Sequence, residues 1–113
     1  MIKTLITLTF LVFLFASKAF AGMKVSSYEK EKNTESFKIY LTGVVNGFAF
    51  SNTELEDRKQ KPLYCPPRNQ LIKVDTYIKF LNEKVSQYPR DRFDKLEIEP
   101  MLLAKLIEVY PCK

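Results

Sequence analysis

The first 21 residues constrain this chain most, because they have the pattern of a secretory signal. A positive start at Lys3 is followed by an apolar run over Leu5–Ala16, and Ala19-Phe20-Ala21 is a small-x-small cleavage site. The run is shorter than the roughly 20 residues that a membrane span needs. We therefore expect cleavage after Ala21 and export. An uncleaved N-terminal anchor is the alternative, and Lys18 is the residue that favours it.

Cleavage after residue 21 of 113 leaves 92 residues, which is enough for one domain. Both charge signs are mixed along this part. It has neither a basic stripe with interleaved aromatics for nucleic acid nor a basic face for a membrane surface. The chain has no His and 2 Cys, which excludes Ser-His-Asp triads, Cys-His dyads and His-bearing or four-thiolate zinc sites. We expect a small binding protein with no metal or cofactor.

An enzyme that uses only carboxylates is a weaker alternative. Pairs such as Asp91 and Asp94 could in principle transfer protons, but they lie in a charged connection where burial would not tune their pKa. We therefore expect no enzymatic activity.

Apolar residues recur at helical spacing in three segments, and no segment shows the sustained alternation of a strand. The first predicted helix is capped by Asn33 or Thr34 and ends near Asn52 and Thr53. Its apolar face comprises Phe37, Tyr40, Leu41, Val44 and Phe48.

The second and third predicted helices are bounded by prolines. The second ends near Pro89, and its narrow apolar stripe comprises Leu71, Val74, Ile78, Leu81, Val85 and Tyr88. The third has Pro100 in its first turn and ends before Pro111, and its expected buried face comprises Leu102, Leu103, Leu106, Ile107 and Tyr110. The predicted fold class is all-α, a small bundle of three main helices with at most a short extra N-terminal turn.

The chain divides into three parts on this basis. Residues 1–21 are the predicted signal peptide, residues 22–36 a short polar leader, and residues 37–113 the helical domain. The leader is rich in charged side chains, which predicts a frayed segment or a solvated turn of helix.

Gly43 and Gly47 lie one turn apart in the first predicted helix. Each costs roughly 1 kcal/mol relative to Ala in a helix interior, so their presence suggests that another backbone comes close. Tight packing inside one subunit and the seam of a homodimer are both consistent with this spacing.

The two cysteines flank the second and third predicted helices. If those helices pack antiparallel, Cys65 before the second lies beside Cys112 after the third. An exported chain meets an oxidising compartment, and no His is present to activate a free thiol. We expect an intramolecular Cys65–Cys112 disulfide.

Several short motifs in order resemble the Rap/Tai family of immunity proteins from bacterial type VI secretion systems. The motifs are Tyr40-Leu41-Thr42-Gly43-Val44-Val45-Asn46-Gly47, Cys65-Pro66-Pro67, Lys79-Phe80-Leu81 with Tyr88-Pro89, Ala104 to Leu106, and Tyr110-Pro111-Cys112. The resemblance covers about Phe37 to Cys112. The family usually has an extra helix before its Gly-Val segment, where this chain has only Gly22 to Thr34.

The resemblance implies a small, helical, periplasmic protein, commonly dimeric. It implies a partner too: a peptidoglycan amidase effector similar to papain-like cysteine peptidases, whose cleft a loop of the immunity protein enters. A generic exported helical interaction domain with no toxin partner is the alternative function.

Two loops are candidates for entering such a cleft. The preferred one is Arg90–Lys95, whose crest Arg90-Asp91-Arg92-Phe93 carries the residue types typical of binding hot spots. The second is Glu54–Lys61, which is longer and would cost more to order on binding. Alternatively, both are ordinary solvated connections, and Phe93 packs into the core.

Overall fold

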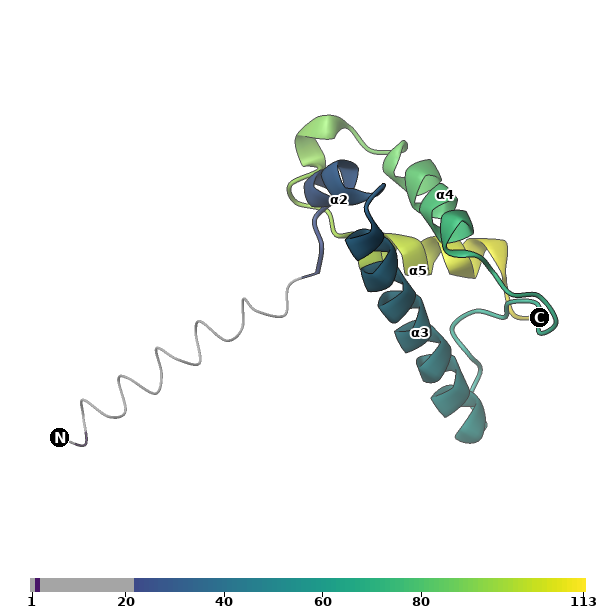
Figure 1. Ribbon diagram of the computed structural model, residues 1–113. Helices are drawn as coiled ribbons and strands as arrows, with labels where there is room; N and C mark the ends of the chain where they lie inside the picture. Colours follow the sequence, from purple (N-terminus) through teal and green to yellow (C-terminus); the bar gives the residue numbers. More distant parts are fainter. Residues whose placement is uncertain (1, 3–21) are drawn as a thin grey trace.

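The computed structural model describes residue 2 and residues 22–113, so the predicted signal lies outside the described residues apart from Ile2. The elements are α2 (Val25–Glu31), α3 (Glu35–Asp57), α4 (Val74–Val85), a short 3-10 turn η1 (Arg90–Arg92) and α5 (Ile98–Val109) (Figure 1). Over the described residues no strand forms, and only one isolated bridge, between Lys24 and Glu97, is present. The prediction of an all-α bundle is confirmed.

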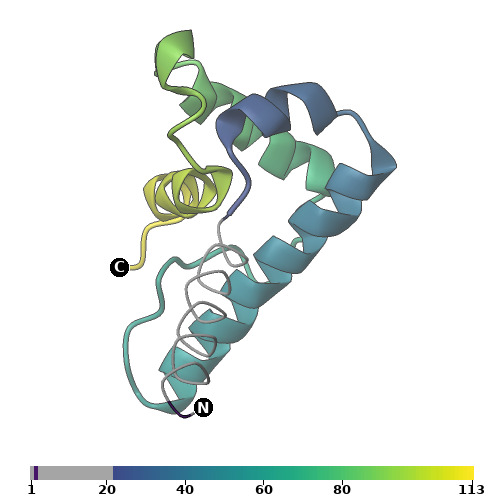
Figure 2. The ribbon, with the colours of Figure 1, turned by 90° about the vertical axis from the view of Figure 1, so that its left-hand side faces the viewer.

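The helices are arranged around the long α3. α4 and α5 pack on each other and run in broadly opposite directions (Figure 1). Figure 2 shows α5 nearly end-on while α3 runs across the view, so these two helices cross rather than lie side by side. α2 lies across the N-terminal end of α3 in both views.

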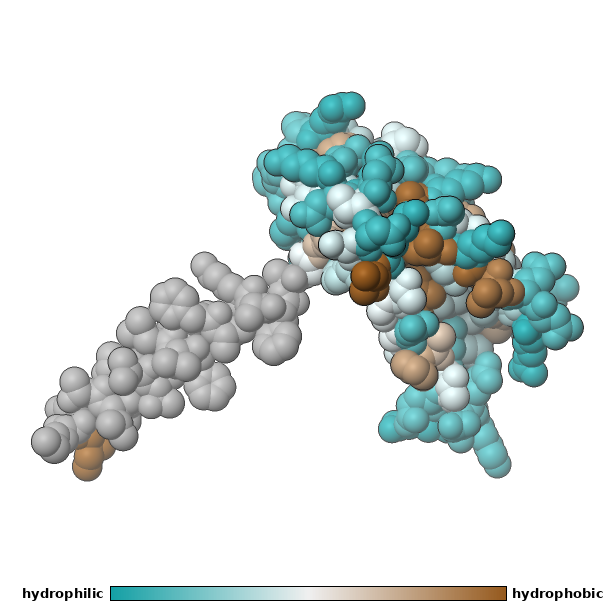
Figure 3. Space-filling model, in the orientation of Figure 1, coloured by the Kyte–Doolittle hydropathy of each residue, from teal (hydrophilic) through white to brown (hydrophobic). Residues whose placement is uncertain are grey.

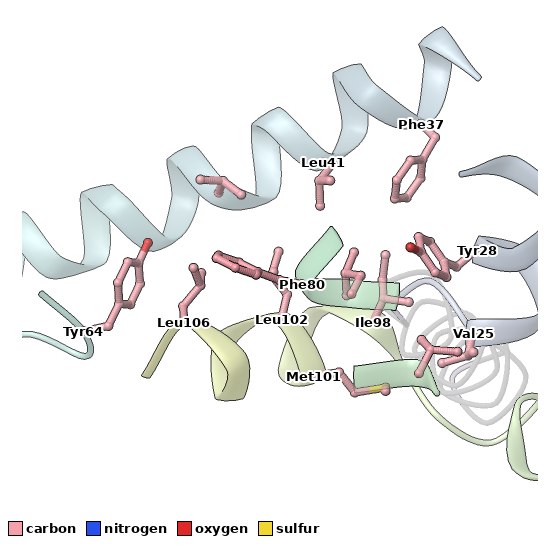
Figure 4. Close-up of a cluster of buried hydrophobic side chains, with 13 residues drawn as sticks. Val25, Tyr28, Phe37, Leu41, Tyr64, Phe80, Ile98, Met101, Leu102 and Leu106 are labelled. Carbon is pink, nitrogen blue, oxygen red and sulfur yellow. The ribbon is translucent and has the colours of Figure 1, made fainter. Parts of the chain in front are cut away.

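One hydrophobic core joins α2, α3, α4 and α5, the four α-helices of residues 22–113 (Figure 4). Its centre is formed by side chains that are at most 1% exposed, from each helix in turn: Tyr28, Leu41, Leu81, Leu102 and Leu106. Burial of a side chain of this size stabilises the fold by roughly 1.5–3 kcal/mol relative to exposure. Because the same cluster contains residues of every helix, no helix is an independent appendage.

The predicted short N-terminal turn of helix is present as α2, but the expectation that this segment is solvated is wrong. Val25 and Tyr28 of α2 are fully buried, and the Tyr28 hydroxyl donates a hydrogen bond to Asn82 Oδ1 at 2.5 Å. The Tyr28 ring packs against the ring of Phe37, with 5.3 Å between centroids. A single apolar pair three residues apart is too short a pattern to stand out among charged neighbours, although it is the buried side of a short helix.

The predicted start of α3 is confirmed, and its predicted end is wrong. Thr34 Oγ1 accepts a hydrogen bond from the Phe37 N–H at 3.2 Å, which is an N-cap. The helix continues past Asn52 and Thr53 to Asp57. Thr53 bonds back to the Ala49 carbonyl, and Asn52 bonds to a later loop, so neither side chain competes for the local backbone that would end the helix.

Three members of the predicted apolar faces are exposed. Tyr40 of α3 is 38% exposed and lies outside the core cluster. Leu71 precedes α4 and is 93% exposed, because the helix starts three residues later. Ile107 of α5 is 43% exposed. The other expected features of α5 are confirmed: Pro100 lies in its first turn, and Leu102 and Leu106 are buried.

Candidate functional site

The predicted disulfide is confirmed. Cys65 and Cys112 are bonded, with their Cα atoms 5.0 Å apart and a separation of 47 positions in the sequence. The Cys65 N–H also donates to the Tyr110 carbonyl at 2.8 Å, so backbone and sulfur together attach the chain end to the segment before α4. The bridge stabilises the base of the α4–α5 pair.

The Arg90–Lys95 loop lies at the other end of the molecule from this bridge (Figure 1). Its residues Arg90, Asp91 and Arg92 form η1 and are all exposed. The Arg92 guanidinium lies over the Tyr88 ring, 6.0 Å from its centroid. The three charged side chains predicted to contact a partner are therefore together on one exposed turn.

Phe93 differs from its three neighbours. It is half-buried and packs against the core cluster, so it lies at the base of the loop and not at its crest. The prediction that Phe93 lies at the exposed crest is wrong, and the alternative that it packs into the core is the arrangement present. An aromatic ring one residue after η1 can turn inward while the arginines remain in water. Its position fixes the turn to the body of the domain.

The first two residues of α2 hold the other side of the loop. The Ser26 N–H donates to the Phe93 carbonyl at 3.2 Å, and the Val25 N–H donates to the Leu96 carbonyl at 2.9 Å. The loop is thus attached through backbone hydrogen bonds to residues that the sequence assigned to a leader.

The loop also borders a hollow of about 280 Å³ whose lining includes Glu29, Lys32, Asn82 and Arg90. Lys32 Nζ lies 3.3 Å from a Glu29 carboxylate oxygen. The hollow therefore presents both charge signs beside the exposed arginines.

The second predicted loop, Glu54–Lys61, is shorter than expected. Its first four residues belong to α3, and Arg58 Nε lies 2.7 Å from Glu54 Oε1 one turn earlier. Lys59 adopts a left-handed conformation with φ of 58°, which reverses the chain at the end of the helix. The expectation of a long flexible loop here is wrong, because half of the segment is helix.

Gly43 and Gly47 do not pack against any part of the described chain. Apart from the adjoining residues and the backbone of α3 itself, a Cβ built on either would have no heavy atom within 4 Å. The prediction of tight packing inside one subunit is therefore wrong, while the predicted homodimer seam stays a prediction. On the same helix Ile39 is 72% exposed and Phe50 is 74% exposed. Figure 3 shows brown, hydrophobic patches on a surface that is otherwise mostly teal and white.

An apolar groove that was not predicted from the sequence lies between α3 and the segment before α4. It has a volume of about 310 Å³, and its lining includes Tyr64, Pro66, Leu71 and Tyr77. Burial raises the pKa of the Tyr77 hydroxyl to about 12, with smaller contributions from the nearby Tyr64 and Tyr110. The one signal in the sequence was that Pro66-Pro67 delays the helix, which leaves the following apolar residues in an extended segment.

The groove continues into a second hollow of about 400 Å³ that shares Tyr64, Pro66 and Pro67 and adds Glu56 and Arg68. The continuous surface is apolar at one end and charged at the other. Within the described residues, no group of three or more His, Cys, Asp or Glu side chains is placed to hold a metal ion. No helix in this part is long and apolar enough to cross a bilayer.

No family model, curated protein or solved structure matches this chain. The resemblance to the Rap/Tai immunity proteins therefore rests on the motifs quoted for it.

Proposed function

We propose that this chain is an exported immunity protein that binds a peptidoglycan amidase effector of type VI secretion and occludes its active-site cleft. The proposal starts from the ordered motifs between Tyr40 and Cys112. Two structural features support it. The fold is a small disulfide-bonded helical bundle, and α2 occupies the place before the Gly-Val segment where the family usually has an extra helix.

The exposed η1 turn on a fixed base is the observation that carries the proposal. A loop that enters a cleft binds more tightly when it is already ordered, since each immobilised flexible side chain costs about 0.5–1.5 kcal/mol on association. Here Phe93 is packed inward and its carbonyl is hydrogen bonded to Ser26. The backbone of the turn is therefore in place before any partner arrives.

The side chains of the turn suit a polar cleft. Arg90 and Arg92 present guanidinium groups that can make paired hydrogen bonds to carboxylates or carbonyls, and Arg is enriched among binding hot spots. Tyr88 lies against Arg92, which limits the conformations that the guanidinium must lose on binding. Asp91 lies between them and only accepts hydrogen bonds, so the turn presents both donors and acceptors.

The test is the affinity of the double variant Arg90→Ala/Arg92→Ala for a candidate amidase effector sought among the neighbouring genes. We expect a loss of about 100-fold or more, as for truncation of hot-spot arginines. Phe93 is left intact because it packs against the core. The matched control is Lys59→Ala/Lys61→Ala, which removes the same charge from the other loop and should leave affinity nearly unchanged. An unchanged affinity of the arginine variant, with helical content preserved, contradicts the proposal.

A cell-survival assay tests the same function independently of the loop. Cells that express the full chain should survive a periplasmically targeted copy of the effector, and cells that express residues 22–113 after a start Met should not. Survival in both cases would contradict export, and survival in neither would contradict immunity.

The apolar groove favours a second candidate, an exported interaction domain with no toxin partner. Leu71 at its edge is 93% exposed, which is unusual for a leucine beside Tyr64 and Tyr77. Such a domain would lose partner binding in Leu71→Ser and keep it in Arg90→Ala/Arg92→Ala. An immunity protein should instead lose partner binding in Arg90→Ala/Arg92→Ala and keep it in Leu71→Ser.

A further inference from the structure

Glu99, in the first turn of α5, contacts the residues that directly follow the predicted cleavage point. Its Oε1 accepts a hydrogen bond from the Met23 N–H at 2.9 Å and another from the Tyr40 hydroxyl. Its second oxygen, Oε2, is buried and has no hydrogen-bond partner among the described residues. A buried carboxylate oxygen without a donor is costly, so this atom calls for an explanation.

Gly22 is the residue that faces the unpartnered oxygen. A Cβ built on Gly22 would lie 2.4 Å from Glu99 Oε2 and 2.8 Å from Glu97 Oε2. Real Cβ atoms do not approach so closely, so the two Glu side chains would have to shift if residue 22 carried a Cβ, and with glycine the chain lies directly against both carboxylates. The Gly22 nitrogen is bonded directly to the Cα that would carry this Cβ, at a distance of about 1.5 Å.

We propose that cleavage between Ala21 and Gly22 creates an α-ammonium that binds in this carboxylate site and completes the fold of the mature chain. Water adds to the Ala21 carbonyl carbon and becomes part of the released carboxylate. The Gly22 nitrogen leaves with the electron pair of the amide bond and takes up two protons, the equivalent of both protons of that water, so it ends as –NH3⁺. This inference rests on the predicted signal peptide and is independent of the proposed partner.

The charge balance of the site favours an ammonium over an amide. In the uncleaved chain the Gly22 nitrogen is a neutral amide with one N–H, whereas the ammonium has three donors and a positive charge. Hydrogen bonds between charged groups are roughly twice as strong as neutral ones. Lys24 Nζ already lies 3.1 Å from Glu97 Oε1, which leaves Glu97 Oε2 and Glu99 Oε2 for the new cation.

Each element around the site contributes an ionisable group that affects the net charge of the site. Lys24 lies at the start of α2, Tyr40 on α3, and Glu97 and Glu99 at the start of α5. Burial and then the hydrogen bond to Glu99 raise the pKa of Tyr40 to about 12, so it stays a neutral donor. Glu97 and Glu99 carry two negative charges, and Lys24 neutralises one of them. The remaining negative charge can pair with the positive charge of the chain terminus.

The first experiment uses the chain exported with its own signal and purified after processing. Mass spectrometry and N-terminal sequencing should find Gly22 as the first residue. Selective ¹⁵N-glycine labelling then allows an NMR titration of the α-amine, because the chain has only 3 glycines. We expect its pKa to be about one unit above the ordinary range of roughly 7.7–8.0.

The variant Glu99→Gln should return that pKa most of the way to its ordinary value. The matched control Glu108→Gln, on the exposed end of the same helix, should not change it. A mature chain that starts at another residue, an α-amine pKa in the ordinary range, or a raised pKa that Glu99→Gln leaves unchanged would each overturn the proposal.

A second measurement needs no substitution at Glu99. The α-amine of the folded protein should react with an acetylating reagent about ten-fold more slowly than that of the urea-unfolded chain at pH 8, because the bound ammonium is protonated and enclosed. Glu97→Gln should reduce the difference in acetylation rate between the folded and the unfolded chain. Equal rates in the folded and unfolded chains would show that the terminus is free in solution and would refute the site.

Discussion

The side chain of Asn52 is hydrogen bonded to the backbone on either side of the peptide that joins Leu63 to Tyr64. Its Nδ2 donates to the Tyr64 carbonyl at 3.1 Å, and its Oδ1 accepts from the Leu63 N–H at 2.8 Å. Asn52 is 8% exposed and is the buried polar side chain of the described core. It attaches the last turns of α3 to the segment that enters the disulfide.

Replacement of Asn52 by Ala should destabilise the protein by about 2–3 kcal/mol, because a buried carbonyl and an amide N–H lose their partner together. The free energy of unfolding in urea measures the loss. Asn46→Ala, an exposed asparagine on the same helix, is the control and should change stability by no more than about 0.5 kcal/mol. Equal effects of the two variants would show that the Asn52 bonds contribute no net stability.

The disulfide should account for a large part of the stability of this small domain. A bridge across 47 residues is worth on the order of 4 kcal/mol in the chain-entropy model. Cys65→Ser should therefore lower the melting temperature under oxidising conditions and leave it unchanged in a reductant. If the two proteins melt together in both conditions, the bridge does not stabilise the native state.

Local chemistry made the helical fold and the disulfide predictable from the sequence. Thr34 caps α3, Pro100 opens α5, and Cys65 pairs with Cys112, each by a rule that depends on near neighbours or on the order of elements. The burial of Tyr28 was not predictable in this way. It depends on Asn82, 54 residues later, which offers the hydroxyl a partner.

The candidate site was predictable only in part, for the same reason. Charge and position indicated Arg90 and Arg92, and both are exposed. The inward position of Phe93 and the exposure of Leu71 depend on where α2 and the Pro66-Pro67 segment pack, which no short sequence pattern specifies.

Stability should fall between pH 10 and pH 12, and Tyr77 contributes to this fall. Its pKa is about 12 in the folded chain against 10.0 in the unfolded one, chiefly because of burial. In this window the unfolded state loses a proton that the folded state keeps, so the free energy of unfolding decreases as pH rises. Below about pH 10 the contribution of Tyr77 to the free energy of unfolding is fully present. Tyr77→Phe should make the decrease less steep while matching the wild type at pH 8. An unchanged slope would mean that Tyr77 does not titrate with unfolding.

The glycines on the outer side of α3 give a prediction that separates folding from association. Because a Cβ at Gly43 or Gly47 meets no heavy atom within 4 Å apart from the adjoining residues and the backbone of α3 itself, Ala at either position should fit the single chain without strain. Each substitution should then stabilise the helix by roughly 1 kcal/mol, the difference in helix propensity between Gly and Ala. Urea unfolding at a concentration where the chain is monomeric by analytical ultracentrifugation measures this gain.

The same two variants test the predicted homodimer seam. If a partner helix lies close to Gly43 and Gly47, the added methyl groups separate the backbones, and Gly43→Ala/Gly47→Ala weakens dimerisation while it strengthens the monomer. Ala49→Gly, on the groove side of α3, is the control that changes helix propensity away from the seam. A double variant that gains stability and sediments as the wild type does would remove these glycines from the dimer interface, and one that loses stability as a monomer would contradict the open surroundings of both residues.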